Sequence, residues 1–368
     1  MVLTAAHRPL LVIRELALVL PRAVAALWQS DGWSPTSPRA MGQLGEVALD
    51  ELVLTGMSVM GARVAASPRP MESYVPAAEE LSALGAAAHA DPPPLQVREI
   101  RRRRIGRLAY ETMTFEHDPL LPRSLAAERL GGPVTAGVHL CRHSDGGRPW
   151  LVWVHGAGQG GPLDLLLSRA GRIHQELGNN IAFPIQPGHG FRRNAWPSYP
   201  DTEPLANVAG MIRGISGVRA VMRWLRPRAT GTVVSGVCLG SPVAALVSHL
   251  EPVDAVALYT PILGLNAMIA RHIHRQGASA HRAGTLMRCD TVTALTSVVD
   301  PLTVEPSAPP DRRLIVGVRN DRMAMPEPAL ALHQRWGGQL YWYDGSHVGH
   351  VFSPTVHAVT ERFLAGLR

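Results

Sequence analysis

The sequence predicts an α/β fold in which a mostly parallel sheet is covered by helices on both faces. From about residue 97 to the end, short continuous apolar runs alternate with amphipathic segments. Continuous apolar strands are typical of a sheet that is buried on both faces, and helical crossovers provide that cover. The 368 residues are 46% hydrophobic, enough to bury a large core.

The predicted elements follow one another regularly along the chain. Apolar or alternating runs predict strands at 107–115, 135–143, 149–158, 180–190, 231–238, 255–262, 312–318 and 340–347. Amphipathic runs predict helices at 163–177, 208–225, 242–250, 328–336 and 358–367.

Two segments fall outside this alternation. Residues 1–92 have apolar residues at helical spacing and end in the linker-like stretch "AHADPPP" at 88–94, which predicts an N-terminal helical region before a domain at 93–368. Residues 263–308 are too long for a simple connection and predict an inserted helical lid. Because the sheet already has helices for both faces, we expect these two segments to roof the pocket together.

The composition excludes several kinds of chemistry. The formal charge is +7, and all 36 basic residues are arginine. Schiff-base, pyridoxal-phosphate and P-loop mechanisms need a lysine, so none is expected. The run "RRRR" at 101–104 lacks interleaved aromatic residues or a nucleic-acid motif, which favours a solvated surface face and no nucleic-acid partner.

The cysteines and the N-terminus indicate a cytoplasmic protein. Three cysteines at unrelated spacings, Cys141, Cys238 and Cys289, do not form a disulfide framework. The apolar run at 9–28 is interrupted by charges and proline, so no signal peptide and no stable membrane insertion are predicted, although an interfacial helix stays open.

The stretch "TVVSGVCLGSPVAALVSHL" at 232–250 is typical of a strand, a sharp turn and a helix. Glycines stand two residues on either side of Cys238, where larger side chains would collide across a strained turn. The N-terminus of the following helix favours thiolate over thiol. A nucleophilic Cys238 is therefore one interpretation, and a small buried cysteine is the other.

Further candidate groups appear in a suggestive order. "VHGAGQGG" at 154–161 follows a strand, so Ala157 or Gly158, with Leu239, could supply oxyanion-hole N–H groups, while His155 is more often structural. Asp321 follows a later strand, and two histidines, His347 and His350, follow the last one.

These segments together resemble the α/β-hydrolase superfamily from about residue 97 to the C-terminus. The matching motifs are "HGAG" at 155–158, "QPGHG" at 186–190, "GVCLG" at 236–240, "NDRMAMP" at 320–326 and "GSH" at 345–347. The resemblance implies a triad of Cys238, His347 and Asp321. It favours His347 because family members commonly have a proline seven residues after the catalytic histidine, as Pro354 is here. His350 is then a pocket or supporting residue.

The cysteine in the elbow differs from the serine of most members. Dienelactone hydrolases and polyhydroxyalkanoate synthases share Gly-x-Cys-x-Gly, and the synthases' histidine loop is similar to "GSHVG" here. A thioester intermediate stays activated toward acceptors other than water, so we expect an acyl hydrolase or acyltransferase acting on a small-molecule or carrier-bound substrate without a cofactor. The resemblance also implies a role in actinobacterial secondary metabolism.

Alternatives stay open at this point. One is a lyase on the same fold that eliminates a carboxylate such as acetate from an O-acylated tetronate-type intermediate, and another is a non-catalytic binding module. The lid arginines, among them Arg271 and Arg275, either lie on the surface or hold an acidic substrate. The lid histidines match no zinc template, so no metal site is predicted.

Overall fold

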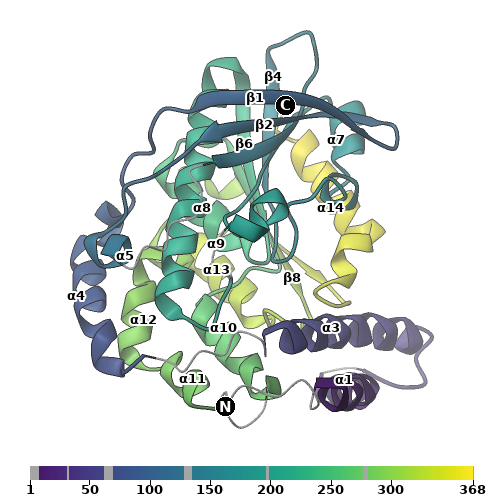
Figure 1. Cartoon of the computed structure of the whole chain (residues 1–368). Helices are drawn as coiled ribbons and strands as arrows, with labels where there is room; N and C mark the ends of the chain where they lie inside the picture. The colour runs from purple at the N-terminus through teal and green to yellow at the C-terminus, as the bar shows by residue number, and fades with distance from the viewer. Residues whose placement is uncertain are drawn as a thin grey trace.

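The computed structural model describes residues 8–30, 33–61, 69–127, 135–195, 199–276 and 281–367 (Figure 1). Parts of the predicted N-terminal region, 1–7, 31–32 and 62–68, and of the predicted lid, 277–280, lie outside the described residues.

Within the described residues, nine strands form one sheet in the order β1-β2-β3-β5-β4-β6-β7-β8-β9. The first three pairings, β1 with β2, β2 with β3 and β3 with β5, are antiparallel, and all others are parallel. The strands are β1 (Gln96–Ile105), β2 (Leu108–Glu116), β3 (Thr135–Cys141), β4 (Arg148–Val154), β5 (Asn180–Pro184), β6 (Ala229–Val237), β7 (Ala255–Tyr259), β8 (Arg313–Val318) and β9 (Gln339–Tyr343).

Helices cover both faces, as predicted. One face packs against α8 (Pro204–Leu225), α9 (Gly240–Leu250) and α13 (Glu327–Trp336). The other packs against α7 (Ala170–Glu176) and α14 (Pro354–Ala365). Alternate residues of one strand supply the two cores: in β4, Val152 joins the first and Leu151 the second. This architecture is the α/β-hydrolase fold.

The arginine run belongs to a strand that the sequence analysis did not predict. Arg101 to Arg104 lie in β1, an edge strand whose side chains are exposed. Arg102 lies 3.8 Å from Glu111 on the neighbouring strand. Charged side chains on an edge strand prevent edge-to-edge association, and the expected solvated face is present on this strand.

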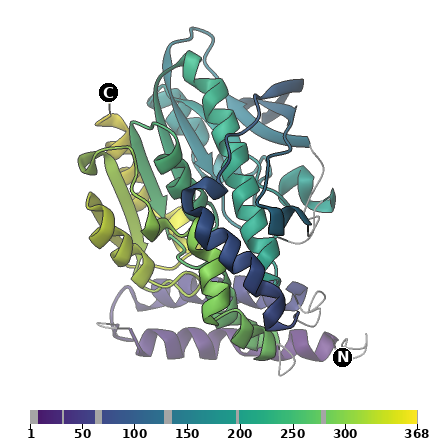
Figure 2. The same ribbon diagram turned by 90° about the vertical axis from the view of Figure 1, so that its left-hand side faces the viewer.

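The N-terminal helices separate into two groups. α1 (Arg8–Ala17), α2 (Val19–Trp28) and α3 (Ala40–Gly61) lie across one end of the molecule, below the sheet in Figures 1 and 2. α4 (Val75–Leu84) instead packs along the side, beside α12 (Asp290–Thr296), and Leu81 is part of the main core. No helix within the described ranges has both the length and the apolarity needed to cross a bilayer.

Short helices fill the described part of 263–308. They are α10 (Leu265–His272), η6 (Ile273–Gln276), α11 (His281–Leu286), α12, η8 (Ser297–Val299) and η9 (Pro301–Thr303). Their apolar side chains, Val292 and Leu295 among them, join the same core as α8 and α9, while η6 contacts α3.

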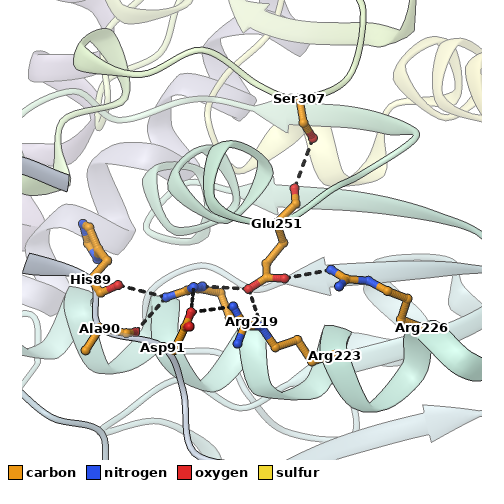
Figure 3. A network of polar contacts seen from close by, with 8 residues as sticks. All are labelled: His89, Ala90, Asp91, Arg219, Arg223, Arg226, Glu251 and Ser307. Carbon is orange, nitrogen blue, oxygen red and sulfur yellow. Dashed lines mark hydrogen bonds and ion pairs between the residues drawn. The ribbon is translucent and has the colours of Figure 1, made fainter. Parts of the chain in front are cut away.

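A buried ion-pair network fixes the linker between the N-terminal helices and the sheet (Figure 3). Glu251, only 2% exposed at the end of α9, accepts hydrogen bonds from Arg219, Arg223 and Arg226, with N–O distances of 3.0, 2.7 and 2.7 Å. Arg219 also donates to the backbone carbonyl of Ala90 at 2.8 Å and to Asp91 at 2.9 Å. The predicted linker at 88–94 is thus held against α8.

The Glu251 network predicts a stability effect. Glu251→Gln keeps the side chain's size but leaves the buried Arg219 without a full countercharge. Because the desolvation penalty of a buried guanidinium is then no longer offset, we expect the free energy of unfolding to fall by about 3 kcal/mol. The matched control is Glu176→Gln, which removes the surface pair with Arg172 and should change little. Urea unfolding of both variants checks this, and equal effects would contradict it.

Candidate active site

Cys238 occupies the turn between β6 and α9 in a left-handed conformation, with φ of +52°. A non-glycine residue in this region is strained and needs support from its surroundings. The Cys238 N–H donates to the carbonyl of Tyr259 on the neighbouring strand at 3.0 Å. The Ser241 hydroxyl donates to the Cys238 carbonyl at 2.6 Å and accepts the N–H of Ile262 at 2.9 Å.

The glycines of the elbow are required by close backbone contacts. A Cβ on Gly236 would overlap the Gly240 carbonyl, and a Cβ on Gly240 would overlap the carbonyl oxygens of Val154 and His155. This agrees with the steric reason expected for their spacing. The turn brings β4 and β6 close enough for the loop after β4 to reach Cys238.

The loop after β4 lies beside Cys238. A Cβ on Gly156 would lie 3.2 Å from the Cys238 Cβ, and the Gly156 N–H donates to the Gln159 side chain at 2.6 Å. Within the described residues, no backbone hydrogen bond is formed by the N–H of Ala157 or of Leu239. Gly158 has φ of +78°, a conformation that glycine allows in this turn.

His155 ties two loops together. It is fully buried, and its Nε2 accepts the Gln186 N–H at 3.0 Å, so its Nδ1 carries the proton and donates to the Gly156 carbonyl at 2.8 Å. Burial lowers the pKa of His155 to about 3, with a further contribution from His189, and keeps the ring neutral. His155 therefore supports the loop that carries Ala157 and Gly158.

The structure brings Asp321 and His347 together from separate loops. Asp321 Oδ2 lies 2.8 Å from His347 Nδ1. Its Oδ1 accepts the N–H groups of Met323 and Ala324, both at 2.8 Å, which fixes the carboxylate. Because Nδ1 faces Asp321, the other ring nitrogen of His347 is the one available to Cys238.

Electrostatics favour a charged His347. Burial by itself would lower the pKa of His347, but the Asp321 carboxylate and then Cys238, by charge and hydrogen bonding, raise it well above its ordinary value. An imidazolium beside the sulfur stabilises a thiolate, as in other cysteine–histidine pairs.

His350 and the two lid arginines have other surroundings. The His350 ring is buried, stacks on Tyr259 with 6.3 Å between centroids, and hydrogen-bonds the His347 carbonyl through Nδ1. Burial lowers the pKa of His350 to about 4. Arg275 is buried in a bidentate pair with Glu51, at 2.7 and 3.2 Å, whereas Arg271 is exposed. The Arg275 guanidinium is thus bound within the protein rather than open to an acidic substrate.

Helix α3 supplies residues that the sequence analysis missed. Three carboxylates from α3, those of Glu46, Asp50 and Glu51, point at the histidine and acid loops and at the lid. Burial would raise the pKa of Glu51, but Arg275 and Arg322 lower it below its ordinary value. Buried acids in an otherwise apolar helix were the available signal, since such residues are almost never buried unpaired.

A cavity adjoins the elbow on the α7 and α14 side of the sheet. Its wall carries residues from the ends of four adjacent strands and one from the histidine loop: Trp153, Phe183, Val237, Tyr259 and His350. Trp153 stacks on Tyr259 with 5.4 Å between ring centroids. The described residues contain no group of three or more His, Cys, Asp or Glu side chains arranged to hold a metal ion.

The sheet order and the helices on both faces give this chain the α/β-hydrolase fold. Acetyl xylan esterase 1 from Thermoanaerobacterium sp. JW/SL YS485 shares this fold, with a TM-score of 0.52 and 13% identity over 82% of this chain and 95% of that one. No protein-family model matches the chain.

Two sequence relatives place the chain more narrowly. Uncharacterized protein Rv2627c from Mycobacterium tuberculosis (strain ATCC 25618 / H37Rv) is 31% identical over 289 residues, which cover 75% of this chain and 68% of the relative. Uncharacterized protein MT2702 from strain CDC 1551 / Oshkosh matches with the same values. The chain belongs to the family of these mycobacterial proteins.

The environment of the three cysteines predicts selective alkylation. At about pH 7, iodoacetamide should modify Cys238 at least about tenfold faster than Cys141, because His347 stabilises the Cys238 thiolate whereas burial raises the pKa of Cys141 to about 12. Peptide mass spectrometry over time measures the rates. Cys238→Ser is the control, and faster modification of Cys141 or Cys289 would contradict the prediction.

Proposed function

We propose that this chain is an enzyme that cleaves or transfers the acyl group of an ester or thioester through Cys238, His347 and Asp321. The observation that carries the proposal is the His347 ring, which Asp321 holds at Nδ1 and whose pKa is raised by Asp321 and by Cys238 in a strained elbow. An ordinary buried cysteine requires neither the strain nor the carboxylate–imidazole pair.

The proposed reaction has two halves. His347 takes the Cys238 proton, the sulfur adds to the acyl carbonyl, and the N–H groups of Leu239 and of Ala157 or Gly158 stabilise the oxyanion. Collapse of this intermediate breaks the bond to the leaving group, which receives the proton from His347 and departs. Water or another acceptor then gives its proton to His347, attacks the thioester and releases Cys238.

The thiol favours a substrate whose acyl group is passed on. Since a thioester remains activated, an amine or alcohol acceptor can compete with water once bound. A small-molecule or carrier-bound acyl donor satisfies this chemistry. We place the acyl group toward the cavity beside Val237, Tyr259 and His350, whose apolar and aromatic wall suits a hydrocarbon group.

An acyl-trapping experiment tests the reaction class. Full-length protein quenched in acid after mixing with p-nitrophenyl acetate, or with an acetyl thioester of N-acetylcysteamine, should carry an acetyl group on Cys238, because deacylation of a thioester is slow enough to leave it populated. Intact and peptide mass spectrometry detect it. Cys238→Ala should carry none.

The outcomes separate the candidate classes. Turnover of an O-acetylated substrate by Cys238→Ala, with loss of acetate and formation of a double bond, would replace the proposal with the lyase. Absence of both adduct and turnover across these donors would favour a binding module.

The triad predicts non-additive losses in the same assay. His347→Ala and Asp321→Asn should each lower kcat/KM by about 10³-fold or more, and the double variant should lose little beyond the worse single variant, because the groups act as a unit. His350→Ala should cost less than about tenfold, since its ring contacts Tyr259 and the His347 carbonyl. An inactive His350→Ala beside an active His347→Ala would contradict this assignment.

A further inference from the structure

We propose that Asp50, which comes from the N-terminal helix α3, is a positioning residue for His347 and is required for full reactivity of Cys238. The inference rests on the proposed function and goes beyond it, because it extends the active site to a helix about 190 residues before the nucleophile in the chain.

The contacts of Asp50 bridge both loops of the triad. Its Oδ1 accepts the Val348 N–H at 2.8 Å, and its Oδ2 accepts the His347 N–H at 2.9 Å and the Arg322 N–H at 3.2 Å. Arg322 directly follows Asp321 in the chain. The fully buried Asp50 carboxylate thus fixes the backbone at His347 and the backbone next to Asp321.

The charge of Asp50 also acts on the imidazole. Burial raises the pKa of Asp50 to about 6, the His347 charge opposes this shift, and the Asp321 charge adds to it. The charged groups around Asp50 are His347 and Asp321 on the loops and Glu46 and Glu51 on its own helix. The side chains of Arg275 and Arg322 bind Glu51. A second carboxylate near His347 favours the imidazolium and hence the Cys238 thiolate.

The histidine loop is shaped to receive α3. Glu46, one turn before Asp50, accepts the Ser346 N–H at 3.0 Å and the Tyr343 hydroxyl at 2.7 Å. A Cβ on Gly345 or on Gly349 would overlap the Glu46 carboxylate. The two glycines of "GSHVG" therefore allow α3 to approach closely enough for Asp50 to reach His347.

Asp50 and Glu46 offer a matched pair of substitutions. In Asp50→Asn, one oxygen becomes an NH₂ group that faces a backbone N–H in either orientation, and the negative charge is lost. In Glu46→Gln, the new NH₂ group can donate to the Tyr343 hydroxyl, so its contacts survive. Both replacements keep side-chain size, which limits unfolding, and Asp50→Ala serves as a second variant.

The experiment measures the rate of Cys238 alkylation by iodoacetamide against pH in the full chain. For Asp50→Asn we expect the rate near pH 7 to fall about tenfold, because the imidazolium loses a nearby negative charge and its backbone anchor. Glu46→Gln should lower this rate clearly less than Asp50→Asn does, because its contacts survive. With p-nitrophenyl acetate, Asp50→Asn should lower kcat more than it raises KM.

The outcomes separate the two proposals. A wild-type Cys238 without enhanced reactivity near pH 7 would contradict the proposed function and this inference with it. A reactive wild type whose profile is shared by Asp50→Asn and Asp50→Ala, both folded by circular dichroism, would overturn the role of Asp50 alone. Equal shifts in Asp50→Asn and Glu46→Gln would assign the effect to general loosening of α3 and would likewise overturn it.

Discussion

The left-handed backbone at Cys238 is the constraint on which the arrangement of the site depends. With φ of +52°, Cys238 adopts a conformation that non-glycine residues rarely take, while β6 and α9 stay in close contact. That contact leaves room only for glycine at 236 and 240, and it brings the backbone of the loop after β4 against the elbow. Strain of this kind persists only where the surroundings hold it, and here the Tyr259 carbonyl and the Ser241 hydroxyl do so.

Around the elbow, the polar groups of the site are held by backbone hydrogen bonds rather than by side-chain packing alone. Asp321 accepts two N–H groups of its own loop and faces His347 with its other oxygen. Asp50 accepts N–H groups from the histidine and acid loops. Loops between strands are the most mobile parts of such a fold, so buried carboxylates that bind their N–H groups define the position of the imidazole.

The fold class and the parallel strands could be predicted because each depends on local sequence. Apolar runs define buried strands, and a glycine pattern defines a turn that few other residues allow. The arginine strand β1 was not predicted, because its edge position leaves both faces exposed and removes the apolar signal. His155 and Arg275 could be named as candidates, but their partners, Gln186 and Glu51, could not.

The sequence by itself determined the α/β-hydrolase fold, the order of cysteine, acid and histidine, and the glycines of the elbow, since propensity and steric exclusion act over a few residues. Only the tertiary structure decided that α3 lies against the histidine loop, that Asp50 binds the backbone of His347, and that Arg275 is paired with Glu51. These contacts join residues more than two hundred positions apart, and a buried carboxylate in a helix does not reveal which distant N–H group or guanidinium compensates it.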